Sequence, residues 1–246
     1  MHTLAGLAGT NVTAWATHCA ERIALITVIR PGCLADILSS RLLKRSSPNK
    51  TSKTKRAEEI LELPDGVYFF AGRAHPSRAG DAAFFIAAEN LSQHDGRATP
   101  FDTGGVAHEI TRLPWDDGTS ASRDAKKRRY VQSHSVQIED FKTYFARHLS
   151  AFFESAPDYW ASLPSRPIDG VAFGAVPDYD WLDWTFEVRY YSDLPVTGMD
   201  LYAMHDVAET VWDREAAGDG ILPGRIVVVD NPGVEAEKAA RIRATL

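Results

Sequence analysis

Strict alternation of side-chain character over residues 184–191 constrains the fold more than any other feature. Trp184, Phe186, Val188 and Tyr190 point to one face, and the intervening polar side chains point to the other. A period of two residues is the period of a β-strand. A strand with one apolar and one polar face is typical of an antiparallel sheet, so residues 184–191 are predicted to be such a strand.

The rest of the chain mixes strand and helix patterns in irregular order. Runs of β-branched and aromatic residues predict strands at 22–29, 67–71, 106–111 and 225–230, the last of them buried. Apolar spacing or composition predicts helices at 33–43, 57–63, 80–89, 138–155, 201–215 and 235–246. Because no regular alternation of strand and helix runs through the chain, we predict the α+β class and no doubly wound sheet.

Composition is that of a single globular domain over residues 1–246. Hydrophobic residues make up 44% and charged residues 24% of the chain, which is enough apolar material to build a core. Two polar segments, a basic insertion at 44–56 and a charged stretch at 114–134, are predicted to be flexible loops. The net charge of -6 disfavours general binding to nucleic acid, which requires a basic surface.

Cysteine content and hydropathy indicate a cytoplasmic protein. Cys19 and Cys33 are the two cysteines, too few for a disulfide framework. No segment reaches the roughly 18 consecutive apolar residues of a membrane span. The apolar N-terminus has no basic region before it, so a signal peptide is not expected.

Glu187 is the first candidate functional residue. It lies between Thr185 and Arg189 on the polar face of the predicted strand. A strand holds a carboxylate rigidly, as a reaction at a glycosidic bond requires. The alternative is an exposed Glu–Arg pair on the solvent face of a sheet, which contributes little to stability.

Three patches in order along the chain resemble one enzyme family. They are residues 26–29 (ITVI) with 37–42 (ILSSRL), residues 66–70 (GVYFF), and residues 185–189 (TFEVR). Their order is similar to that in toxin-like and poly-ADP-ribose-polymerase-like ADP-ribosyltransferases. The resemblance implies a split, mainly antiparallel sheet with flanking helices. It also implies NAD as substrate, with transfer of ADP-ribose to a macromolecular acceptor or hydrolysis of NAD.

The same resemblance implies roles for four residues. Tyr68 would stack on the nicotinamide ring, and Glu187 would stabilise an oxocarbenium-like transition state. Thr27 or Arg30 would hold the NAD ribose or carboxamide. Thr27 stands where the polymerase-like branch has a His. From the residues alone, Tyr68 can equally be a core aromatic of a buried strand.

The segment from Phe101 to Gly105 is a second candidate. Adjacent Gly104 and Gly105 let the backbone approach a ligand and present N–H groups to an anion, and Asp102 can accept from a sugar hydroxyl. The alternative is an ordinary glycine-rich turn into the strand predicted after it.

Two other classes of function stay open at this point. The aromatic-rich segment 159–184 could be the surface of a non-enzymatic interaction domain, since Trp and Tyr dominate interface energetics. A metal-dependent hydrolase or nuclease could use Asp102, His108 and Glu109, although no metal-ligand spacing stands out in the sequence.

Overall fold

A computed structural model of the chain describes residues 12–46, 49–72, 80–87, 90, 94–108, 119–152, 186–216 and 224–245. The strands of this part are β1 (Ala24–Ile29), β2 (Leu42–Leu43), β3 (Val67–Ala71), β4 (Ala82–Ala87), β5 (Gly96–Thr99), β6 (Val136–Gln137), β7 (Glu187–Tyr190), β8 (Leu194–Pro195), β9 (Asp200–Ala203) and β10 (Arg225–Val228). The α-helices are α1 (Val12–Arg22), α2 (Leu34–Ser40), α3 (Ser52–Leu61), α4 (Thr103–Ala107), α5 (Ser120–His134), α6 (Phe141–Phe152), α8 (His205–Ala216) and α9 (Pro232–Thr245).

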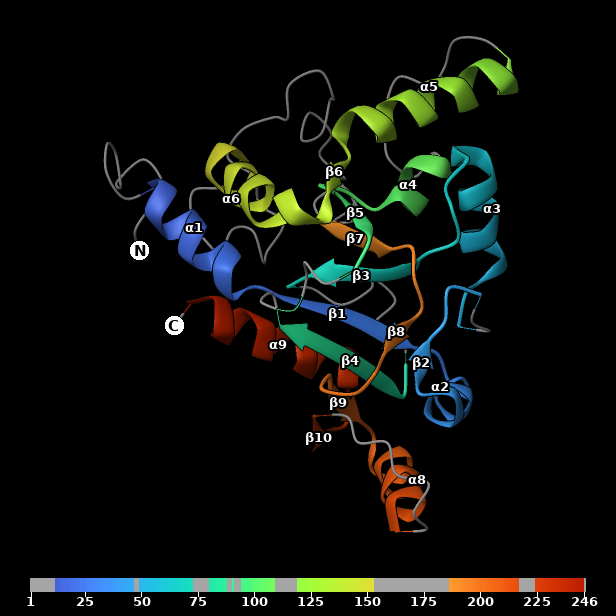
Figure 1. Cartoon of the computed structure of the whole chain (residues 1–246), viewed down its shortest axis with the longest axis vertical. Helices are drawn as coiled ribbons and strands as arrows, with labels where there is room; N and C mark the ends of the chain where they lie inside the picture. Colours follow the sequence, from blue (N-terminus) through green and yellow to red (C-terminus); the bar gives the residue numbers. More distant parts are fainter. Residues whose placement is uncertain are drawn as a thin grey trace.

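Eight of these strands form one sheet, in the order β10-β9-β4-β1-β3-β7-β5-β6, and β2 pairs separately with β8. The neighbours in the large sheet are antiparallel except β9 and β10, which are parallel. Figure 1 shows this order from β6 near the top to β10 near the bottom. The α+β class and the mainly antiparallel sheet predicted from the sequence are therefore confirmed.

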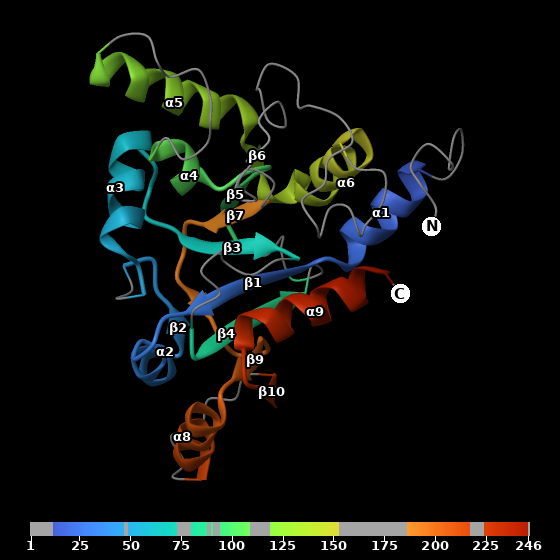
Figure 2. The same cartoon turned by 180° about the vertical axis from the view of Figure 1, so that it is seen from behind.

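Helices cover both faces of the sheet. Helix α9 lies across β1 and β4 (Figure 2), where its small residues Ala236 and Ala240 pack against side chains such as Ile26. On the opposite face, the Phe186 ring meets Phe145 of α6 edge to face, with the ring centroids 5.0 Å apart. Burial of these apolar surfaces is the main stabilising contribution to the fold.

Residues 80–89 contain strand β4, and the predicted helix is wrong there. Phe84 and Ile86 pack into the core cluster on one side of the sheet, and Ala83 and Phe85 pack into the cluster on the other. A strand buried on both faces has a continuous apolar run. Its sequence carries no period that separates it from a buried helix.

The predicted strand at 106–111 is also wrong, because α4 occupies its beginning. Asp102 caps this helix, its side chain accepting hydrogen bonds from the N–H groups of Gly104 and Gly105. An aspartate that satisfies the first N–H groups favours helix initiation. Residues 109–111 lie outside the described part of the chain.

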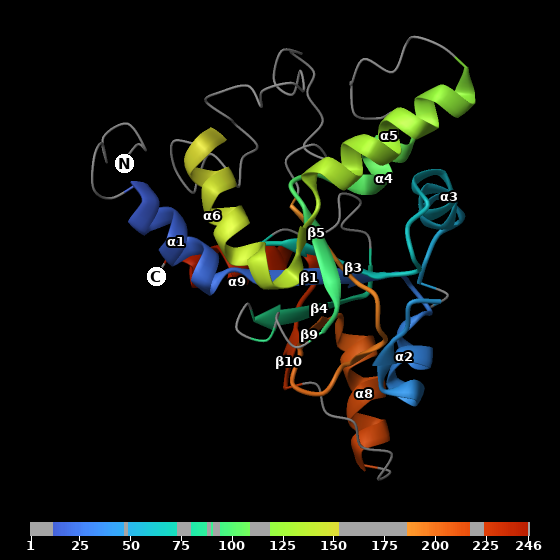
Figure 3. The same ribbon diagram turned by 45° about the horizontal axis from the view of Figure 1, so that its top comes forward.

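Both predicted polar loops contain helices. Helix α3 begins inside the basic segment after Thr51, whose hydroxyl accepts from the Thr54 N–H group at 3.0 Å. Helix α5 occupies 120–134 and buries Lys127 and Val131. Its sequence is too polar to show a strong apolar stripe, which explains why periodicity predicted a loop. Figure 3 shows α5 next to α4, above β5.

The C-terminal predictions need two further corrections. Residues 201–215 contain most of strand β9 as well as helix α8. The strand predicted at 225–230 exists as β10, but it is an edge strand and partly exposed rather than buried.

Candidate functional site

Strand register brings Tyr68 and Glu187 to the same face of the sheet. Phe70 on β3 lies directly opposite Glu187 on β7, and Tyr68 lies directly opposite Arg189. Directly opposed residues in antiparallel strands share a face, as do residues two apart in one strand. Tyr68 and Glu187 are therefore diagonal neighbours on adjacent strands, a distance that an aromatic side chain can span.

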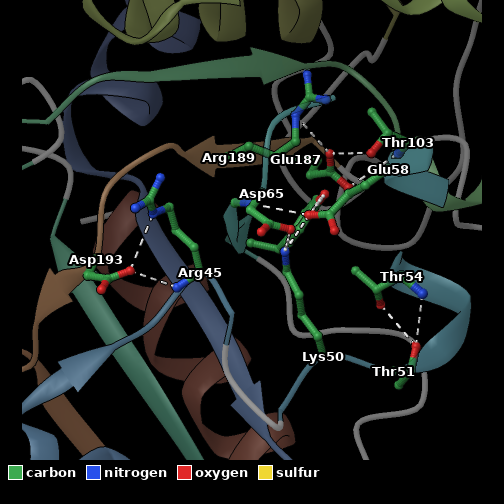
Figure 4. A network of polar contacts seen from close by, with 12 residues as sticks. Arg45, Lys50, Thr51, Thr54, Glu58, Asp65, Thr103, Glu187, Arg189 and Asp193 are labelled. Carbon is green, nitrogen blue, oxygen red and sulfur yellow. Dashed lines mark hydrogen bonds and ion pairs between the residues drawn. The ribbon is translucent and has the colours of Figure 1, made fainter. Parts of the chain in front are cut away.

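The Glu187 carboxyl group is enclosed by protein. Its side chain accepts from the Thr103 N–H group at 3.2 Å and from the Thr103 hydroxyl at 2.7 Å. The Nε atom of Arg189 lies 3.3 Å from Glu187 Oε1. Glu187 is 1% exposed. Figure 4 shows Glu187 between Thr103 and Arg189, so the polar face of this strand is buried and does not face solvent.

Burial sets the protonation of Glu187. Loss of hydration is the largest effect and raises the pKa of this carboxyl from 4.5 to about 8. The guanidinium of Arg189 and the hydrogen bonds from Thr103 act in the opposite direction, while the nearby charge of Asp102 raises the pKa further. At neutral pH the group is therefore mostly protonated.

The Asp102–Gly105 turn packs beside Glu187, but its N–H groups are already engaged. The Gly104 N–H group donates to Asp102 Oδ1 at 2.7 Å, and the Gly105 N–H group donates to the same oxygen at 3.4 Å. The expected anion site at the two glycines is thus a helix cap made within the turn. Thr103, which lies between Asp102 and Gly104 in the sequence, connects the turn to the Glu187 carboxyl group.

Tyr68 is held by a second buried carboxylate, Glu58 of α3. The Tyr68 hydroxyl donates to Glu58 Oε1 at 2.9 Å. The Lys50 ammonium group and the Gly66 N–H group donate to the same oxygen. Burial, followed by the charges of Glu187 and Glu58, raises the pKa of Tyr68 well above its ordinary value. Tyr68 is therefore a neutral, half-buried ring fixed in place by its hydroxyl.

Thr27 does not join Tyr68 and Glu187. Ile26 on β1 lies opposite Phe70, so Ile26 shares the face of Glu187. Thr27 is the next residue and points to the other face. The structure thus contradicts the expected convergence of Thr27 with the other two side chains.

Arg30, the alternative to Thr27, is hydrogen-bonded to the segment before α3. Its Nε atom donates to the Asn49 carbonyl at 2.9 Å, and its Nη2 atom donates to the Lys50 carbonyl at 3.3 Å. These bonds hold the segment that delivers the Lys50 ammonium group to Glu58. Arg30 therefore supports the Tyr68 side of the site from a distance.

The residues of the other two hypotheses are placed only in part. Within the described residues, no group of three or more His, Cys, Asp or Glu side chains could hold a metal ion. The His108 ring lies 2.9 Å from the Lys53 carbonyl, while Glu109 and the aromatic segment 159–184 lie outside the described residues. No helix in the described part of the chain has the length and apolar character to span a membrane.

Sequence reasoning missed the side chains that hold this site together. Glu58 and Thr103 bind the two candidate residues, and Arg97 of β5 lies directly opposite Arg189. The capping pattern after Asp102 could have indicated Thr103. Strand β5 is only four residues long, and Gly96, Ala98 and Thr99 around Arg97 are all buried. Its sequence therefore shows no alternation of apolar and polar residues that would predict a strand.

Comparison with known proteins gave no match. Neither a family model, nor a curated protein, nor a solved structure matches this chain. A functional proposal therefore depends on the arrangement of side chains around Tyr68 and Glu187.

Proposed function

We propose that this protein transfers ADP-ribose from NAD to a macromolecular acceptor, or hydrolyses NAD, at Tyr68 and Glu187. The observation that carries the proposal is their position on one face of adjacent strands. In addition, the three strands that resemble the ADP-ribosyltransferase family, β1, β3 and β7, are consecutive neighbours in the sheet. We also propose that the chain has the ADP-ribosyltransferase fold.

The proposed chemistry breaks the bond between the nicotinamide nitrogen and the ribose. The bonding electrons leave with nicotinamide, and a positively charged, oxocarbenium-like sugar develops. An ionised Glu187 would stabilise that charge, as carboxylates do in glycoside cleavage. The acceptor, or water, then adds to the sugar carbon and releases its proton. The fixed ring of Tyr68 would stack on the nicotinamide.

Access to Glu187 requires a local rearrangement. Thr103 occupies both carboxyl oxygens and the side chain is closed from solvent. A substrate would contact the carboxyl group only after the Asp102–Gly105 turn separates from β7. The same separation would hydrate Glu187 and favour its ionised form, because burial is what keeps the proton on it.

The test is incubation with NAD labelled in the adenylate part, with nicotinamide release and label transfer as readouts. At about pH 8.5, where the carboxyl group is mostly ionised, Glu187→Gln is expected to lower turnover at least about 100-fold. Glu209→Gln is the matched control, since Glu209 is an exposed residue of α8, and it should retain wild-type activity.

A folding control accompanies the activity measurement. At about pH 6 the Glu187 carboxyl group is protonated and nearly isosteric with an amide, so Glu187→Gln should keep the wild-type circular dichroism spectrum. Equal NAD turnover in the folded variant and the wild type would refute the role of Glu187. No turnover by the wild type with any acceptor or water would refute the proposed function.

A further inference from the structure

Two arginines face each other across the strands beside Glu187. Arg189 of β7 lies directly opposite Arg97 of β5 on one side and opposite Tyr68 of β3 on the other. Gln137 of β6 lies opposite Arg97. The four side chains therefore form one row on the face of the sheet that also carries Glu187.

The hydrogen-bonding capacity of both guanidinium groups is largely unused. Arg189 is 1% exposed, yet its Nε and Nη1 atoms have no hydrogen-bond partner among the described residues, the 3.3 Å contact of Nε with Glu187 being an ion pair. Its Nη2 atom makes a long bond of 3.4 Å to the Ser135 hydroxyl. The side chain of half-buried Arg97 has neither a hydrogen bond nor an ion pair within the described chain. A guanidinium carries five N–H donors, and a buried donor without an acceptor is costly.

Few ion pairs balance the charge of these two arginines in the described part of the chain. Among the described residues, the carboxylate that forms an ion pair with Arg189 is Glu187, whose burial keeps it mostly protonated at neutral pH. Asp95 directly precedes β5, and its main-chain carbonyl accepts a hydrogen bond from the Tyr191 N–H group. Like charges placed directly opposite in a sheet repel each other. Within the described residues, Arg97 therefore has no ion pair, and Arg189 has one only with Glu187.

We propose that Arg97 and Arg189 form a binding site for a phosphate or diphosphate group. Guanidinium groups match the geometry of phosphate oxygens and bind them through paired N–H donors. Solvent exposure also falls along the row, from exposed Gln137 through half-buried Arg97 to buried Arg189. A ligand entering from the β6 side meets Arg97 first and gains from the charge of Arg189 behind it.

If NAD is the substrate, the bound group is its diphosphate. This identification rests on the proposed function. Tyr68 ends the same row, and Glu187 lies in the next row of the sheet. The nicotinamide end at Tyr68 and Glu187 and the diphosphate at Arg97 would then occupy neighbouring positions on one face of the sheet.

The direct test is titration calorimetry with inorganic pyrophosphate at constant ionic strength. The wild type is expected to bind saturably, and Arg97→Gln to bind roughly tenfold or more weakly, because a charge-assisted contact is lost. Arg97→Lys keeps the charge but not the paired donors and should be intermediate. Arg45→Gln is the matched control and should bind like the wild type, since Arg45 is an exposed arginine paired with Asp193.

Several results would overturn the anion site. Failure of the wild type to bind pyrophosphate is one, and equal affinity in Arg97→Gln is another. Malonate binding as tightly as pyrophosphate would reassign the site to carboxylates. The Arg97 side chain is half-buried and repelled by Arg189, so Arg97→Gln should not lower the unfolding midpoint, and weaker binding by the variant would not reflect unfolding.

NAD kinetics separate this inference from the proposed function. Arg97→Gln is expected to raise KM for NAD roughly tenfold with a smaller effect on kcat. If the wild type binds pyrophosphate but does not cleave NAD, the proposed function is refuted and the proposed anion site is supported. If Arg97→Gln cleaves NAD with an unchanged KM, the proposed anion site is refuted and the proposed NAD-cleaving activity stands.

Discussion

Replacing Glu187 with glutamine is expected to flatten the pH dependence of stability. Burial raises the pKa of this carboxyl group from 4.5 to about 8 in the folded chain, whereas in the unfolded chain it keeps its ordinary value. Between the two values the folded state binds the proton more tightly than the unfolded state. The contribution to the free energy of unfolding is therefore complete below the unfolded pKa and is lost as pH rises through the folded pKa.

The magnitude follows from the difference between the two pKa values. Each pH unit in this window removes up to about 1.4 kcal/mol from the free energy of unfolding. From the ordinary value of 4.5 to about 8, the loss adds up to about 5 kcal/mol. A loss of that size is comparable with the whole stability of a small domain, about 5–15 kcal/mol.

The assay is urea unfolding followed by circular dichroism at pH values between about 5 and 8. Glutamine does not titrate, so the difference between wild type and Glu187→Gln isolates this group. The wild type should lose about 4 kcal/mol relative to the variant across that range. Glu209→Gln, at an exposed position, should follow the wild type. Parallel curves for wild type and Glu187→Gln would show that the carboxyl group is not held protonated by burial.

Two further substitutions test the contacts around the site. Lys50→Met is expected to lower the free energy of unfolding by about 3–5 kcal/mol, because it leaves the buried Glu58 carboxylate without its cation. Adding Glu58→Gln to this variant should recover part of that loss. Additive effects of the two substitutions would contradict the coupling between the two side chains. Asp102→Ala should lower the free energy of unfolding by about 1 kcal/mol, because the cap of α4 is lost, while Asp102→Asn should keep most of the stability that the cap provides. Equal losses for the two variants in urea unfolding would show that the cap is not the cause.

Much of the fold could be predicted from local patterns. The strands β1, β3 and β7 and the helix α6 lie where the sequence predicted strands and a helix, because their apolar periods are local properties of the chain. The predictions that proved wrong concern β4, α4, α5, the start of α3, strand β9 and the burial of β10. Strand β4 is apolar on both faces, and α5 is polar with little apolar period, so neither carries a distinguishing pattern.

Less of the candidate site could be predicted in advance. The alternation around Glu187 correctly placed Glu187 and Arg189 on one face of a strand. Nothing in that pattern specified which neighbouring strand would lie beside it. Register placed Tyr68 near Glu187 and turned Thr27 to the opposite face. A shift of one residue would have reversed both outcomes.

The amino-acid sequence alone determined the α+β class, the positions of the strands β1, β3 and β7, and the residue types available for chemistry. Tertiary structure decided that the polar face of β7 is buried, that Glu187 is bound by Thr103, and that Arg97 meets Arg189. The physical reason is that side-chain alternation is set by the local backbone, whereas register, burial and the pKa that follows from burial depend on segments far apart in the chain.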